Sequence, residues 1–181
     1  MKTNIILTLL LVTVFSCKSV EQRPVTLTFD FDPCDYLSVN KLSPILGLLV
    51  TDIIAQSAEN SPNKKVCTYY RNISPKPEPL VNVSIEYNPD KTSSGFSKVI
   101  ESMLVNGLPG SSGIMKYKKI DDDRFNAIYT QDESLFNQAY IEVANQYLVV
   151  IEYDKKLSKQ SGSTDLIIKI IESVLYDEKV Y

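Results

Sequence analysis

The chain has 181 residues, with 19 basic and 22 acidic side chains and a formal net charge of −3. This weakly acidic balance, without a block of lysine or arginine, argues against nucleic-acid binding, which needs clustered positive charge. The chain contains no histidine, which excludes His-dependent catalytic triads and histidine-ligated zinc or haem sites. We therefore expect no cofactor and no metal site.

The first segment has the features of an export signal. Lys2 precedes an apolar run from Ile5 to Phe15, which is too short to span a bilayer. The run leads into Val14-Phe15-Ser16-Cys17, which resembles a bacterial lipobox, although Phe15 is bulkier than the usual residue. The resemblance implies that Cys17 is acylated and becomes the new N-terminus. The alternative is an ordinary signal peptide with an incidental cysteine.

These features divide the chain into a signal peptide over 1–16, a lipidated cysteine and polar tether over 17–24, and a single globular domain over 25–181. Removing residues 1–16 from the 181 leaves 165, which suits one domain of ordinary size. Lys18 is not the aspartate that retains some lipoproteins at the inner membrane. We therefore expect an outer-membrane location, on either the periplasmic or the external face.

Two cysteines, Cys34 and Cys67, remain once Cys17 is lipidated. In an exported chain, two remaining cysteines favour a disulfide bond. Such a bond would stabilise the fold by about 4 kcal/mol on the chain-entropy model. The alternatives are two buried free thiols or a reactive thiol.

The first half of the domain contains two segments of strict alternation, at 25–31 and 80–87, and both predict half-buried strands. Two interpretations of the helix between them remain open. Either Ser38 caps a helix that ends at Gly47, or Ser43 caps a helix that runs on to Ile54. The remaining segments are expected to be a polar loop over 57–65, a short strand over 66–70 and a proline-rich connector over 73–79.

The second half begins with an amphipathic helix capped by Ser93 or Ser94 and ended by Asn106-Gly107. A mobile glycine-rich loop over 108–113 follows. Apolar spacing then predicts four strands, at about 114–120, 125–130, 138–144 and 147–153, with a turn at Asn145-Gln146. A polar loop over 155–162 precedes a final helix that begins at Ser163.

This order of elements predicts an α+β fold, a single domain in which an antiparallel sheet packs against about three helices in a sandwich-like arrangement. Because the strands alternate, each has a more polar face. We expect helices to cover one face of the sheet fully and the other in part.

The segment around the cysteines carries a recognisable pattern, Asp32-Pro33-Cys34, then Leu37-Ser38, Ile45-Leu46-Gly47 and Cys67-Thr68-Tyr69. It is similar to the D-P-C…L-G…C-[ST]-[YW] signature of small bacterial lipoproteins of unknown function. The resemblance covers about residues 30–70 and departs from the family at Pro44 and in the long stretch between Gly47 and Cys67. It implies a Cys34–Cys67 bridge and a compact α/β sandwich, but no activity.

The segment 107–117 is the candidate recognition surface, because glycine and serine allow a loop to move and loops often carry function. Its candidate contact residues are Leu108, Ser111, Ser112, Met115 and Tyr117. A plain linker is the alternative interpretation. The acidic run over 121–123 lacks the oxygen spacing of a calcium loop and is expected to be a turn.

Catalytic residues are not expected. Without histidine, a serine–lysine pair is the one familiar dyad available, and Ser97-Lys98 and Ser158-Lys159 are adjacent in sequence, so their side chains diverge. The sequence therefore favours a non-enzymatic module held to the membrane by its lipid. We expect its partner to be an envelope protein or an apolar or cell-wall ligand. The alternatives are an enzyme inhibitor or scaffold that uses the 107–117 loop, and an envelope hydrolase with a serine–lysine pair.

Overall fold

The computed structural model describes residues 23–24, 32–90, 95–110, 113–124, 126–130, 136–157 and 163–177. Its central element is a seven-stranded antiparallel sheet in the order β2-β3-β4-β10-β9-β8-β7. The strands are β2 (Ile53–Ser61), β3 (Lys64–Arg71), β4 (Glu78–Tyr87), β7 (Tyr117–Lys119), β8 (Asn126–Thr130), β9 (Phe136–Val143) and β10 (Tyr147–Asp154). The predicted α+β class is confirmed. The predicted strand over 25–31 lies outside the described residues.

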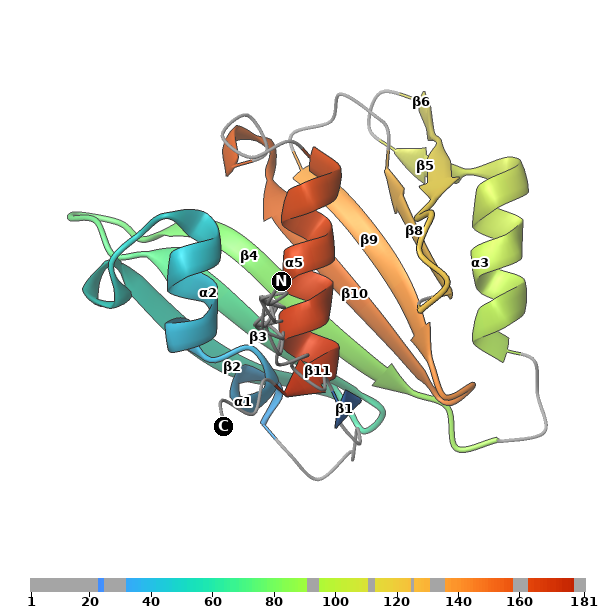
Figure 1. Ribbon diagram of the computed structural model, residues 1–181, viewed down its shortest axis with the longest axis horizontal. Helices are drawn as coiled ribbons and strands as arrows, with labels where there is room; N and C mark the ends of the chain where they lie inside the picture. The colour runs from blue at the N-terminus through green and yellow to red at the C-terminus, as the bar shows by residue number, and fades with distance from the viewer. Residues whose placement is uncertain are drawn as a thin grey trace, which may run out of the picture.

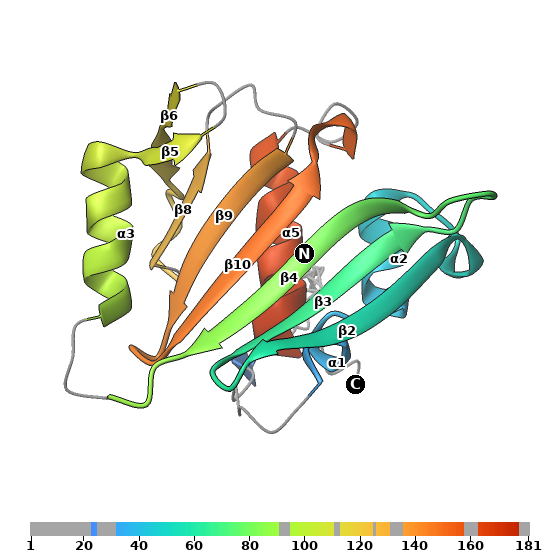
Figure 2. The same cartoon turned by 180° about the vertical axis from the view of Figure 1, so that it is seen from behind.

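Helices pack on both faces of this sheet, but unequally. Helices α1 (Pro33–Tyr36), α2 (Val39–Leu46) and α5 (Ser163–Leu175) lie on one face, where most of the buried side chains gather (Figure 1). Helix α3 (Gly95–Asn106) lies on the other face and contacts β7, β8 and β9. Figure 2 shows that none of the described helices covers β2, β3 and β4 on the α3 side. One face is therefore covered broadly and the other only in part, as the alternating strands predict.

Helix α2 follows the first of the two interpretations that the sequence allows. Ser38 is its N-cap and accepts a hydrogen bond from the backbone of Lys41, and Gly47 ends it with φ +64°. Pro44 lies inside the helix, where Leu42 and Leu46 form its buried side. The extension to Ile54 is wrong, because Gly47 adopts the left-handed conformation that stops a helix and Ile53 already begins β2.

The predicted polar loop over 57–65 is also wrong. These residues form the turn end of a β-hairpin, in which β2 pairs with β3 from Ile53–Arg71 to Ser61–Lys64. Strand β2 is an edge strand with an exposed, polar outer half. Its sequence lacks alternation because most of its side chains are not buried. The strand therefore forms by pairing with β3 rather than by local preference.

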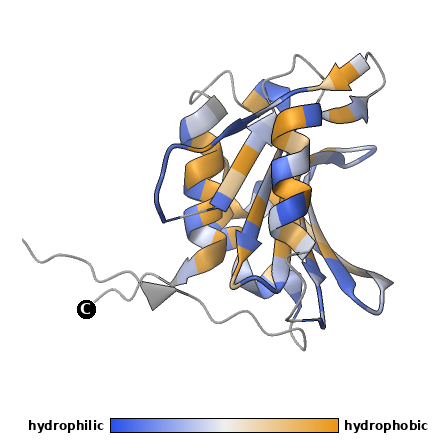
Figure 3. Cartoon of the chain, turned by 90° about the vertical axis from the view of Figure 1, so that its right-hand side faces the viewer, coloured by the Kyte–Doolittle hydropathy of each residue, from blue (hydrophilic) through white to orange (hydrophobic). Residues whose placement is uncertain are grey.

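The segment after α3 is more regular than the glycine-rich loop that the sequence suggests. Strand β5 (Leu108–Gly110) pairs with β6 (Gly113–Met115) in a short antiparallel hairpin. Figure 3 shows hydrophobic residues on this hairpin and on α3 beside it. Gly107 has φ +70°, and a Cβ atom there would lie 2.3 Å from the carbonyl oxygen of Met115. Glycine is therefore required where α3 ends against the hairpin.

The single strand predicted over about 114–120 is wrong, because β6 ends at Met115 in the small sheet and β7 begins at Tyr117 in the large one. The three later strands agree closely with their predictions. Strands β9 and β10 are joined by a tight turn in which Ala144 and Asn145 have positive φ. Helix α5 follows, and its buried residues include Leu166, Ile167 and Ile170. At its end, β11 (Tyr176–Asp177) pairs with β1 (Arg23–Pro24). None of the helices in the described ranges has the length and hydropathy needed to cross a membrane.

Candidate functional site

A row of polar side chains crosses the whole sheet on its α3 side. The strand registers bring one residue from each strand into line, in the sheet order Gln56, Thr68, Asn82, Glu152, Gln138, Thr130 and Tyr117. We call these seven residues the polar row. Because side chains alternate along a strand, all seven project from the same face.

In the middle of the polar row, side-chain hydrogen bonds converge on the carboxylate of Glu152. Asn82 Nδ2 donates to Glu152 Oε2 at 3.1 Å, and Gln138 Nε2 donates to Glu152 Oε1 at 2.7 Å. Thr68 Oγ1 donates to Asn82 Oδ1 at 3.4 Å, which fixes the amide of Asn82. On the other side, the hydroxyls of Tyr117 and Tyr140 both donate to Gln138 Oε1 at 3.3 Å. Glu152 is thus held from both neighbouring strands.

The solvent exposure of the side chains increases along the polar row from Tyr117 to Gln56. Tyr117 and Thr130 are buried below α3, Gln138, Glu152, Asn82 and Thr68 are half-buried, and Gln56 is exposed. A pocket of about 220 Å³ opens beside the half-buried part, where α3 no longer covers the sheet. It is lined by Thr68, Pro79, Leu80, Val81, Asn82, Gln138 and Glu152.

The tyrosines next to this carboxylate are kept neutral. Burial raises the pKa of Tyr117 well above its usual value, and the neighbouring Tyr140 and the negative charge of Glu152 raise it further. Burial also raises the pKa of Tyr140, with a smaller contribution from Glu152. Both hydroxyls therefore remain hydrogen-bond donors to Gln138 across the physiological range.

A second carboxylate on the same face is occupied by structural contacts. The hydroxyl of Ser97 on α3 donates to Glu142 at 2.7 Å, and Asn126 Nδ2 donates to Glu142 Oε2 at 2.6 Å. This cluster ties α3 to β8 and β9. Ser97 therefore contacts a carboxylate, while Lys98 is exposed. The other adjacent pair, Ser158-Lys159, lies outside the described residues.

Another pocket, of about 410 Å³, lies on the opposite face between α2 and α5. Lys41 on α2 crosses to α5 and donates from Nζ to the carbonyl oxygen of Ser173 at 3.3 Å. Glu172 accepts from Arg124 at 2.7 Å, and Arg124 also pairs with Asp122 at 2.6 Å. Lys41 satisfies a carbonyl near the C-terminal end of α5, where positive charge is favourable. The charged groups named here thus serve to connect elements.

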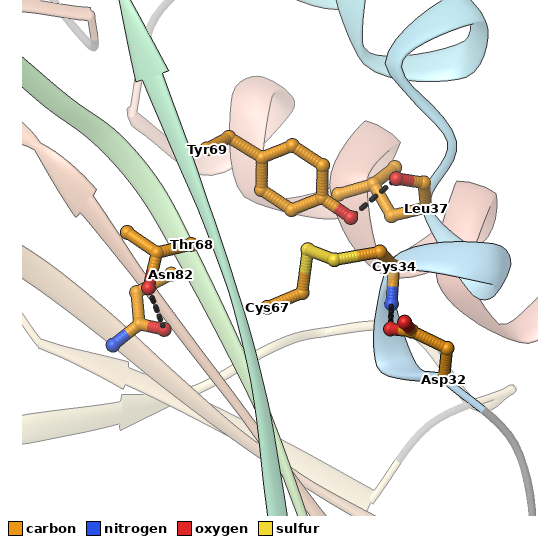
Figure 4. The surroundings of a disulfide bond; sticks show 7 residues. All are labelled: Asp32, Cys34, Leu37, Cys67, Thr68, Tyr69 and Asn82. Atoms are coloured by element: carbon orange, nitrogen blue, oxygen red, sulfur yellow. Dashed lines mark hydrogen bonds between the residues drawn. A yellow bond between two sulfur atoms is a disulfide. The ribbon is translucent and has the colours of Figure 1, made fainter. Parts of the chain in front are cut away.

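Cys34 and Cys67 form a disulfide bond, as the sequence led us to expect, with their Cα atoms 5.2 Å apart. Figure 4 shows the bond between α1 and β3, with Tyr69 beside it. Asp32 caps α1 by accepting from the backbone N–H of Cys34 at 2.9 Å. The buried hydroxyl of Tyr69 donates to the carbonyl oxygen of Leu37. The disulfide bond and the hydrogen bond from Tyr69 to Leu37 therefore attach α1 to β3, and Asp32 caps the helix.

The predicted recognition residues are not all at the surface. Tyr117 is buried in the cluster below α3, and Leu108 and Met115 pack against that cluster. Ser111 and Ser112 lie outside the described residues. The structure instead exposes neighbours of these residues, because pairing of β5 with β6 turns Ile114 outward. Ile114 is 64% exposed, and Val105 at the end of α3 is 83% exposed.

Neither a metal cluster nor a related protein helps to assign a function. Within the described ranges, no group of three or more cysteine, aspartate or glutamate side chains could hold a metal ion. Comparison with protein-family models, curated proteins and solved structures gives no significant match to this chain.

Proposed function

We propose that the chain is a lipoprotein of the bacterial envelope, anchored through Cys17, that binds a protein partner and has no catalytic activity. The supporting observation is that the β1–β11 pair and the β5–β6 hairpin lie far apart in the domain. The first described strand, β1, pairs with β11 at one end, whereas β5 and β6 lie at the other (Figure 1). The described start of the chain and the β5–β6 hairpin thus lie at different ends of the domain.

The length of the tether supports this orientation. Only five residues separate Cys17 from Arg23, so an extended tether between them reaches about 20 Å. Two or three acyl chains on one cysteine give stable anchoring, because each buried methylene contributes about 0.8 kcal/mol. The β1–β11 end would therefore stay close to the membrane surface, with the β5–β6 hairpin turned away from it.

The surface that faces away from the membrane has the composition of a protein-binding site. Val105 and Ile114 are strongly exposed, Leu104 is 36% exposed and Pro109 is exposed. We call these four residues the hairpin tip. Gly107 holds the two parts of the tip together, since Ile114 packs directly against it. Exposed aliphatic groups that gather at one place mark interaction sites. An enzyme as partner would make the chain an inhibitor.

The test compares variants of the full chain in the cell envelope. Proteins are cross-linked in cells, captured through the chain and quantified by mass spectrometry. The double variant Val105→Asp, Ile114→Asp should lose the captured partner by about tenfold or more, because desolvated hot-spot residues dominate binding. The double variant Leu49→Asp, Val50→Asp is the matched control, since these residues are 69% and 46% exposed and follow α2, which lies on the other face of the sheet from α3 (Figure 1). Equal capture by all three proteins would contradict the proposal.

A further inference from the structure

Glu152 is a half-buried carboxylate that forms no ion pair with any of the described residues. Its hydrogen bonds come from two neutral amides, those of Asn82 and Gln138. Within the part of the chain that the structure describes, no lysine or arginine forms an ion pair with it. Burial removes part of the hydration of this carboxylate, and a cationic ligand would replace the lost water contacts.

The hydrogen-bond directions define what such a ligand must supply. Each carboxylate oxygen of Glu152 accepts one amide N–H and keeps capacity for another donor. Asn82 Oδ1 accepts one bond from Thr68 and also keeps capacity. Gln138 Oε1 already accepts from two tyrosines. The pocket therefore offers three acceptor positions on two side chains, which match the three N–H donors of a primary ammonium group.

The rest of the pocket suits an aliphatic chain. The exposed ring of Pro79 lies beside the polar groups, and the nearly buried Leu80 and Val81 complete the wall. The volume of about 220 Å³ leaves room for several methylene groups. A metal ion is a poor match, since it would find one carboxylate where hard cations need several oxygen ligands.

We propose that this pocket binds a primary ammonium group at the end of a short aliphatic chain, with Glu152 as its counter-ion. The ligand can be a free amine or the lysine-type side chain of a peptide, because both present the same chemistry. This site is separate from the hairpin tip and does not depend on the anchoring of the chain.

The experiment titrates the isotope-labelled full chain with n-pentylamine and follows the backbone amide resonances of β4, β9 and β10. We expect saturable shifts centred on Asn82, Gln138 and Glu152. Neutral n-pentanol, which has the same chain, should bind about tenfold more weakly or not at all, because it lacks the charge. An absence of saturable shifts with the amine, or an equal response to the alcohol, would overturn the proposal.

Two variants make the assignment specific. Glu152→Gln keeps the shape of the side chain and removes its charge, and it should weaken amine binding by about tenfold or more. Glu86→Gln makes the same change on the same face of the sheet, opposite Leu148, and should leave binding unchanged. A thermal melt of each variant checks that it is folded. Unchanged binding in Glu152→Gln would refute the role of this carboxylate.

A second titration identifies the source of the ammonium group. Nα-acetyl-lysine methylamide carries the amine on a peptide-like backbone. Tighter binding than n-pentylamine, lost in Glu152→Gln, assigns the pocket to a lysine-type side chain. Binding of n-pentylamine alone assigns it to a free amine. Both results support an ammonium site, and failure of both compounds to bind contradicts it.

Discussion

Gln138 on β9 and Glu152 on β10 lie directly opposite each other in the sheet, and Gln138 Nε2 donates to Glu152 Oε1 at 2.7 Å. The same Gln138 accepts two tyrosine hydroxyls through its other amide atom. It therefore connects the aromatic pair Tyr117 and Tyr140, whose rings are 5.6 Å apart, to a half-buried carboxylate at the edge of the helix-covered region.

Replacing Gln138 with leucine should destabilise the fold. The change leaves the buried hydroxyl of Tyr117 without its acceptor and Glu152 with one amide donor in place of two. An unsatisfied buried polar group costs about 1–3 kcal/mol, and we expect a loss of unfolding free energy in that range by urea denaturation. Gln56→Leu, at the exposed end of the polar row, is the control and should change stability by about 0.5 kcal/mol or less. An equal loss of unfolding free energy in Gln138→Leu and Gln56→Leu would show that the polar row is an ordinary solvated surface.

The disulfide should contribute much of the stability. The two cysteines are separated by 33 positions, so the bond removes chain entropy worth about 4 kcal/mol from the unfolded state. Cys34→Ser should lower Tm by roughly 10 °C under oxidising conditions. Reductant should bring the parent protein down to the Tm of the variant. Identical melting of parent and variant without reductant would remove the disulfide from the account.

Gly107 and Gly47 provide a matched pair for testing the junction between α3 and the β5–β6 hairpin. Both have positive φ, +70° and +64°, but a Cβ atom at Gly47 meets nothing within 4 Å. Gly47→Ala should therefore cost only the conformational strain, about 1–2 kcal/mol. Gly107→Ala adds a clash with the carbonyl oxygen of Met115 and should cost clearly more. A smaller loss at Gly107 than at Gly47, measured by chemical denaturation, would show that the junction is not tightly packed.

Buried tyrosines should make the fold sensitive to alkali. Burial raises the pKa of Tyr153 to about 12, and Tyr129 adds to the shift, whereas an exposed tyrosine in the unfolded chain titrates near 10. The folded state holds its proton more tightly, so this stabilisation is complete below about pH 10 and is lost as the pH rises toward 12. Stability measured across this window should fall less steeply in Tyr153→Phe. An unchanged slope would contradict a buried, neutral Tyr153.

The sequence predicts the buried elements well because burial leaves a pattern. The alternation in β4 and the helical spacing in α5 each follow from contact with the main core. Likewise, Ser38 and Gly47 mark the ends of α2 through local backbone chemistry. These features depend on neighbours in the chain and can be read without knowing the fold.

The errors concern elements that depend on distant partners. Strand β2 lies at an edge with few buried side chains, and β5 and β6 have three residues each. The polar row was missed for the same reason. Asn82, Gln138 and Glu152 each occupy an ordinary polar position in an alternating strand. Only the registers between strands, which a single sequence does not specify, bring them together.

The central claim, that a lipid on Cys17 holds this domain at a membrane, is tested most directly by the intact mass of the protein purified from its native cells. We expect a chain that begins at Cys17 and carries the added mass of two or three acyl chains, in the membrane fraction. A Cys17→Ala variant should not be processed or acylated. A native product with an unmodified Cys17, or one that retains residues 1–16 in the cytosol, would contradict the account.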